Sequence, residues 1–192
     1  MIKRLCVFGV AAMALCSWTL GVRADEPTAF SLAKEGNRYL GEQSRDKVVQ
    51  IRSEKSVQGL TPNLWYVVYY DPTTTFNAVE IKFGAGKMLH IKRPTRLLEP
   101  ITGDDKVLNR EKFKVDSDKA ILTASKEPTL DRLTLRATQL WLQRSDEGPV
   151  WKVRFWGAKF RKPGDDADIG DIYVSAADGR IIRTDLHIDR LD

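Results

Sequence analysis

Apolar and charged residues alternate near the C-terminus, most clearly in the runs 151–155, 172–176 and 180–186. Side chains of an extended strand point alternately to opposite faces of a sheet, so each run is expected to bury one of its faces. Asp178-Gly179 separates the last two runs, and Asp-Gly suits the positive φ angles of a tight hairpin turn. The pattern therefore predicts an antiparallel meander in residues 150–189.

Earlier parts of the chain show two helical patterns and several further strand patterns. The first helix is expected to begin near Ala29 with Thr28 as its N-cap, and the second to follow the capping pair Asp116-Ser117. Pro128 ends the second helical pattern. Strands are predicted at four places before the second helix: 47–52, 64–70, 77–83 and 88–92.

Residues 133–143 fit the period of a helix and that of a strand, and an internal repeat decides between them. Trp65 and Trp151 head two similar runs that are 86 positions apart. At that offset further pairs match: Val49 with Leu135, Ile51 with Ala137, Val67 with Val153, and Tyr69 with Phe155. Because 47–52 is strand-like, the repeat predicts a strand at 133–143.

The repeat also predicts how the chain is divided. Gly-Ala-Gly-Lys at 84–87 matches Ala-Asp-Gly-Arg at 177–180 after an insertion of seven residues. We therefore predict an α+β fold of two tandem modules, each a short helix packed on an antiparallel four-stranded sheet. The first module is expected at 25–94 and the second at 116–192, joined by a linker at 95–115 that is rich in turn residues.

The N-terminus has the features of a secretory signal peptide. Lys3 and Arg4 precede an apolar run at 5–20, and small residues lead to a cleavage site after Ala24. The apolar run is too short to favour a permanent membrane span. A lipid anchor at Cys16 is the alternative, although a large residue stands where lipoprotein signals have a small one. The mature protein is thus expected to be exported, either periplasmic or secreted.

Cleavage changes what the composition implies. The segment 1–24 carries three of the 31 basic residues and none of the 26 acidic ones, so the net charge falls from +5 to +2. So small a charge argues against nucleic acid or an anionic membrane as the partner. Cys6 and Cys16 also leave, so we expect a mature chain without disulfides or thiol chemistry.

The second predicted module resembles the PepSY domain over residues 115–186. The likeness lies in four stretches: 116–121 entering a helix, 149–153 and 172–174 as strands, and 178–182 as the closing hairpin. Residues 29–93 resemble the family more faintly, because Ala85 replaces the aspartate of the closing turn.

The PepSY resemblance implies a role as well as a fold. PepSY domains occur in exported bacterial proteins, including the propeptides of thermolysin-type proteases, and are thought to bind or restrain proteases. The tandem plan is also similar to that of secreted β-lactamase inhibitor proteins. Neither resemblance brings catalytic residues, and the sequence lacks the motifs of serine hydrolases, zinc proteases, phosphate loops and dinucleotide sites. We therefore predict a non-catalytic protein without a cofactor.

Two groups of polar residues are candidates for chemistry. His90 and His187 alternate with apolar neighbours, so both imidazoles are expected to face away from the core, as solvated residues rather than as a general base or metal ligand. The acidic run 164–171 is a weak calcium candidate through Asp166, Asp168 and Asp171. Its spacing departs from that of an EF-hand, and a solvated hairpin loop is the alternative reading.

The aromatic strands at 64–70 and 150–156 carry the main functional hypothesis. One face of these strands (Trp65, Val67 and Tyr69; Trp151, Val153 and Phe155) is expected to pack beneath the helix of its own module. The opposite face carries the residues predicted to bind a partner: Tyr66, Val68, Tyr70, Lys152, Arg154 and Trp156. Tyr, Trp and Arg are enriched at binding hot spots. The alternative is that these faces pack the two modules against each other.

The sequence therefore predicts an exported protein-binding module whose partner is another exported or envelope protein, with a protease favoured by the resemblance. A homodimer is also compatible with the pattern. A module that senses a small ligand or calcium, in the cleft between the copies or at the acidic run, remains the alternative function.

Overall fold

The computed structural model describes residues 26–93, 107–146 and 148–192. The predicted signal peptide with its two cysteines, and most of the predicted linker, lie outside the described residues. No helix in the described ranges is long and apolar enough to cross a membrane.

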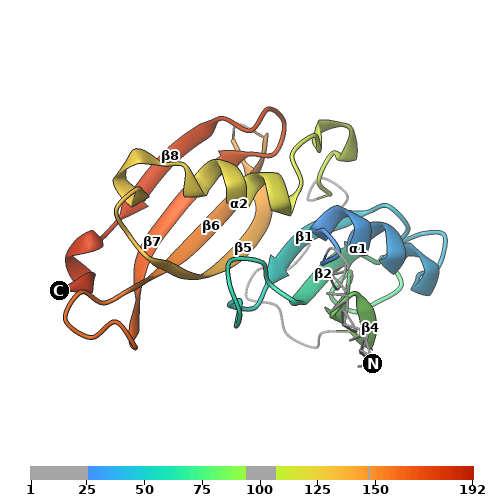
Figure 1. Cartoon of the computed structure of the whole chain (residues 1–192). Helices are drawn as coiled ribbons and strands as arrows, with labels where there is room; N and C mark the ends of the chain where they lie inside the picture. Colours follow the sequence, from blue (N-terminus) through green and yellow to red (C-terminus); the bar gives the residue numbers. More distant parts are fainter. Residues whose placement is uncertain (1–25, 94–106, 147) are drawn as a thin grey trace, which may run out of the picture.

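Eight antiparallel strands form one sheet with the order β4-β3-β2-β1-β5-β6-β7-β8. The α-helices α1 (Ala29–Gly36) and α2 (Ser117–Ser125) lie on the same face of this sheet, α1 over β1 and β2 and α2 over β6 and β7 (Figure 1). The strands are β1 Val48–Ser53, β2 Leu64–Tyr70, β3 Ala78–Gly84, β4 Lys87–Lys92, β5 Leu135–Ser145, β6 Gly148–Ala158, β7 Asp166–Ser175 and β8 Ile181–Leu186. The α+β class and the antiparallel pairing are as predicted.

Several local predictions are confirmed. The ambiguous segment forms β5, as the repeat indicated. The Thr28 hydroxyl accepts a hydrogen bond from Ser31 N at the start of α1, and the Asp116 carboxylate accepts one from Ser117 N at the start of α2. In β6 the residues Trp151, Val153 and Phe155 are fully buried while those between them are half-buried, as period two requires.

The expected division into two four-stranded sheets is not found, because β1 pairs with β5 and joins the strands into one sheet. This pairing is short and covers only Ile51 with Leu142 and Arg52 with Trp141. Hydroxyl groups continue the junction: Ser53 Oγ accepts from Leu140 N at 2.9 Å, and Ser56 Oγ accepts from Thr138 N at 2.9 Å. These bonds satisfy backbone groups that would otherwise be buried without a partner.

The helices are joined at their N-termini. Ser117 Oγ accepts a hydrogen bond from Ala29 N at 3.0 Å, and Asp116 Oδ1 accepts one from Phe30 N at 3.1 Å. The residues that cap α2 therefore also satisfy free amides at the start of α1. We call residues 26–93 the first half of the chain and residues 107–192 the second half, and the two halves are hydrogen-bonded through both the sheet and the helices.

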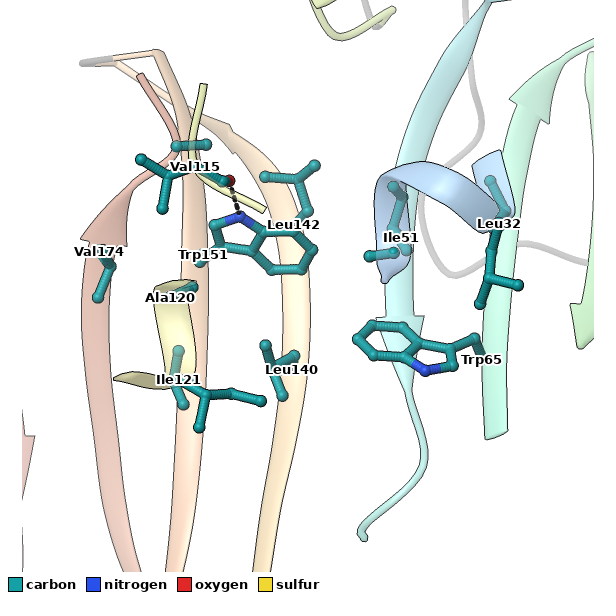
Figure 2. Close-up of a cluster of buried hydrophobic side chains, with 14 of the residues drawn as sticks. Leu32, Ile51, Trp65, Val115, Ala120, Ile121, Leu140, Leu142, Trp151 and Val174 are labelled. Carbon is teal, nitrogen blue, oxygen red and sulfur yellow. Dashed lines mark hydrogen bonds between the residues drawn. The ribbon is translucent and has the colours of Figure 1, made fainter. Parts of the chain in front are cut away.

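One hydrophobic core runs beneath both helices (Figure 2). Trp65 lies near Leu32 of α1, and the indole N–H of Trp151 donates to the Val115 carbonyl at 2.8 Å. Phe30 of α1 stacks on Trp151 with ring centroids 5.9 Å apart. The expectation that Trp151 packs only beneath its own helix is therefore wrong, because α1 contributes to the core of the second half.

The predicted repeat register is correct for one pair of strands and wrong for another. Val67 in β2 and Val153 in β6 occupy equivalent places, but their partners on the neighbouring strands are Ile51 and Leu140. The counterpart of Ile51 is therefore Leu140, three positions beyond the predicted Ala137. A register shift in each of these pairings shows where the two copies diverge.

Candidate binding surface

The side of the sheet opposite the helices, which we call the open face, carries no helix among the described residues (Figure 1). All six residues predicted to bind a partner lie on it, in β2 and β6. Because the halves meet edge to edge, these two faces lie on one surface and do not pack against each other. Val68 is only 7% exposed and packs with Ala78, Val49 and Tyr70, which leaves it little surface for a partner.

The strand register places one residue from each strand in a line across the whole open face. We call this line the cross-strand row. From β4 to β8 it consists of His90, Lys82, Tyr66, Arg52, Trp141, Lys152, Tyr173 and Arg183. Cationic and aromatic side chains alternate without a break from Lys82 to Arg183. At about 4.8 Å per strand, the row is about 34 Å long.

Each aromatic ring of the row contacts neighbouring cations. The Arg52 guanidinium carbon lies 3.9 Å from the centre of the Tyr66 ring, with Lys82 Nζ 4.9 Å from the same ring. Lys152 Nζ lies 5.5 Å from the Trp141 ring, and Arg183 lies 4.0 Å from the Tyr173 ring. Cation–π contacts at such exposed sites are worth about 0.5–1 kcal/mol each. The row is thus a self-supporting ladder whose cations cover the ring faces.

Carboxylates beside the row hold its cations in place. Glu80 pairs with Arg52 at 2.5 Å. Asp171 accepts from Arg154 Nε at 2.8 Å and lies 3.0 Å from Lys152 Nζ, with only 9% of its side chain exposed. Burial acts to raise the pKa of Asp171, but the hydrogen bonds from Arg154 and Lys152 outweigh it and hold the pKa below its ordinary value. The hydrogen bond to Asp171 likewise raises the pKa of Arg154.

Two cations of the row have no such carboxylate. Within the described residues, no salt bridge joins Lys82 or Arg183 to an acidic side chain, and each is held by its contact with a tyrosine ring. Both ends of the alternating ladder therefore present a positive charge to solvent.

Comparisons with protein-family models, with curated proteins and with solved structures found no match. The PepSY resemblance therefore stays a prediction, and the candidate surface is argued from its geometry alone.

Two further predicted residues extend the surface beyond the row. Trp156 in β6 lies under Lys55, whose Nζ is 4.8 Å from the indole ring and 2.9 Å from Asp166. Tyr70 in β2 lies under Lys47 at 5.2 Å. The same arrangement of a cation over an aromatic ring is thus repeated on both sides of the row.

Sequence reasoning missed five members of the row: Arg52, Lys82, Trp141, Tyr173 and Arg183. Their alignment depends on the register between strands, which period two does not supply. The alternation of buried Leu140 and Leu142 with Trp141 was the available signal, but the offset used for the repeat assigned this strand the wrong phase.

The histidines lie on different parts of the molecule. His90 is in the row, and its Nε2 is the one buried side-chain polar atom without a partner in the described residues. The apolar neighbours expected to face the core are exposed, Leu89 by 53% and Ile91 by 37%. The reason is that β4 is an edge strand and α1 covers β1 and β2 instead. His187 Nε2 lies 3.5 Å from Asp185.

The acidic run does not form a loop as predicted, because Asp166, Asp168 and Asp171 all belong to β7. Each carboxylate has a basic partner: Asp166 pairs with Lys55, and Asp168 and Asp171 pair with Arg154. No cluster of three or more metal-ligating side chains occurs in the part of the chain that the structure describes. These residues therefore give the calcium alternative no support.

Proposed function

We propose that this chain is an exported, non-catalytic protein that binds another protein through the open face of its sheet. The observation that carries the proposal is the cross-strand row, in which tyrosine, tryptophan and arginine side chains alternate with lysines over all eight strands. These are the residue types that dominate binding energy at protein interfaces.

Preorganisation of the row favours binding. Association loses free energy when mobile side chains become ordered, by about 0.5–1.5 kcal/mol for each long side chain. Arg52, Lys152 and Arg154 are already fixed by a ring or a carboxylate, so less entropy remains to be lost. The length of the row also suits a patch of about 800 Å² per partner, which is common in stable complexes.

A polypeptide fits this surface better than a nucleic acid does. Single-stranded nucleic acids are bound largely by stacking bases on bare aromatic faces. Here the faces of Tyr66 and Tyr173 are covered by Arg52 and Arg183, so ring edges, hydroxyl groups and guanidinium N–H groups remain for a partner. Such edges and donors match the backbone and side-chain groups of a protein.

The two halves, as we propose, are copies of one PepSY-like unit of a helix and four strands. The identical order of elements in both halves and the equivalent places of Val67 and Val153 support this. The predicted signal peptide places the partner among exported or envelope proteins, and the PepSY resemblance favours a protease.

Capture from an envelope or culture extract tests the proposal. The variant Tyr66→Ala/Trp141→Ala/Tyr173→Ala removes the rings of the row, and Leu122→Ala/Phe160→Ala removes two residues that are 55% and 54% exposed elsewhere. We expect the wild type and the Leu122/Phe160 variant to retain a shared partner that the ring variant loses. If the folded ring variant retains every partner, the open face is not the binding surface.

A further inference from the structure

A cavity of about 230 Å³ lies on the helix-covered side of the molecule, between α1 and the 3₁₀-helix η3 (Arg110–Lys112). We call it the seam pocket, because both halves of the chain line it. Its lining consists of Phe30, Ala33, Asp46 and Val48 from the first half and Arg110 and Phe113 from the second. It lies on the opposite side of the sheet from the cross-strand row.

The inner wall of the seam pocket is aromatic and rigid. Phe113 stacks on Phe30 with centroids 5.1 Å apart, and Phe30 stacks in turn on the buried Trp151. Ala33, one helical turn after Phe30, leaves the space open because its side chain is a single methyl group. The Tyr69 hydroxyl donates to the Ala33 carbonyl at 2.7 Å and fixes this turn of α1 to the sheet.

A charged group stands at the rim of the seam pocket. Asp46 forms an ion pair with Arg110, and both side chains are more than half exposed. Asn37 holds Asp46 from two sides: its amide donates to the carboxylate at 2.8 Å, and its carbonyl oxygen accepts from Asp46 N at 2.9 Å. These bonds keep Asp46 at a φ of 59°, a left-handed conformation that aspartate tolerates better than most residues.

The anchored Asp46 orients the Arg110 guanidinium and leaves most of it unused. A guanidinium has five N–H donors in a rigid fork, and Asp46 is its single bonding partner among the described residues. The remaining donors match a second carboxylate, which can accept two parallel hydrogen bonds from such a fork.

We propose that the seam pocket binds a small carboxylate that carries an aryl group, with the ring against Phe30 and Phe113 and the carboxylate on Arg110. An apolar cavity of about 150 Å³ is known to admit benzene, so the larger seam pocket has room for a ring with a short side chain. The ligand class has two sources, a free aryl carboxylate or the C-terminal aromatic residue of a peptide. Because both halves line the pocket, such a ligand would stabilise their junction.

Titration of ¹⁵N-labelled protein with 3-phenylpropionate, 3-phenylpropionamide and a tripeptide ending in phenylalanine tests this inference. We expect saturable shifts of the Phe30, Ala33 and Phe113 amides with both acids, and at least about tenfold weaker binding of the amide, which lacks the charge. The tighter of the two acids identifies the source. Equal binding of the acid and the amide, or no saturable shift with either acid, would overturn the proposal.

Two variants check the position of the ligand. Ala33→Leu fills the space beside Phe30, and Arg110→Gln removes the fork from an exposed position, so both are expected to weaken binding of the acid about tenfold or more. Arg132→Gln, at an exposed site elsewhere, is expected to bind as the wild type does. Unchanged binding by folded Ala33→Leu and Arg110→Gln would place the ligand outside the pocket.

Discussion

The two faces of the sheet are built from the same strands by different physical means. On the covered face Trp151 is fully buried, its N–H bonds to Val115, and its ring is stacked against α1. On the open face Trp141, one strand away, is half-buried and contacts the cations Lys152 and Arg154. The first tryptophan excludes water, whereas the second is held by charges that still reach solvent. We therefore expect stability to depend mainly on the covered face and binding on the open face.

Replacing these two tryptophans gives the largest expected contrast. Trp151→Ala should lower the free energy of unfolding by about 3–5 kcal/mol, because it leaves a cavity in the shared core. Trp141→Ala should lower it by about 1–2 kcal/mol, the loss of two cation–π contacts and some apolar burial. Urea unfolding followed by circular dichroism measures both. Equal losses would contradict the assignment of the two faces.

Ser53→Ala tests the covered side of the junction between the halves. It deprives Leu140 N of its acceptor where the β1–β5 ladder ends, and an unsatisfied buried amide costs about 1–3 kcal/mol. Ser145→Ala, whose exposed hydroxyl donates to Gly148 O, is the matched control and should cost less than about 0.5 kcal/mol. A junction variant as stable as the control would show that this bond does not support the joined sheet.

Asp171→Asn tests the carboxylates that organise the open face. The change leaves Lys152 and Arg154 without their shared partner and should cost about 1–2 kcal/mol at neutral pH, since both cations are partly solvated. The pKa of Asp171 lies below its ordinary value of 3.8. Its ion pairs therefore stabilise the fold above that pH, and this contribution is lost as the pH falls through the folded-state pKa.

The pH dependence distinguishes this role from simple loss of packing. Below pH 4 the stability of the wild type should fall more steeply than that of Asp171→Asn, so the two unfolding curves should converge in acid. Parallel curves from pH 7 to pH 2 would show that the carboxylate of Asp171 is not the stabilising group.

Lys82→Ala/Arg183→Ala should have the smallest effect on folding, below about 0.5 kcal/mol, because both are surface cations without a carboxylate partner in the described residues. Partner binding should nevertheless weaken, and its dependence on salt should decrease. Surface plasmon resonance at two salt concentrations would measure this once a partner has been captured. An unchanged salt dependence would exclude these two cations from the interface.

Alternation along the chain predicted the covered face because burial repeats every second residue within a strand. Trp65, Val67 and Tyr69 are buried as expected. The cross-strand row required the register between strands distant in sequence, and the short β1–β5 pairing rests on serine hydroxyls that leave no periodic signal. Asp166 and Asp168 looked like loop residues because their pairing with Lys55 and Arg154 is visible only in the folded sheet.

The most direct test places a photoreactive cross-linker on each face in turn. p-Benzoylphenylalanine at position 141, in the cross-strand row, should cross-link to an exported protein when the producing cells are irradiated. The same group at position 122, exposed on α2, should give no such product. Cross-links from position 122 with none from position 141 would contradict the claim that the open face is the binding surface.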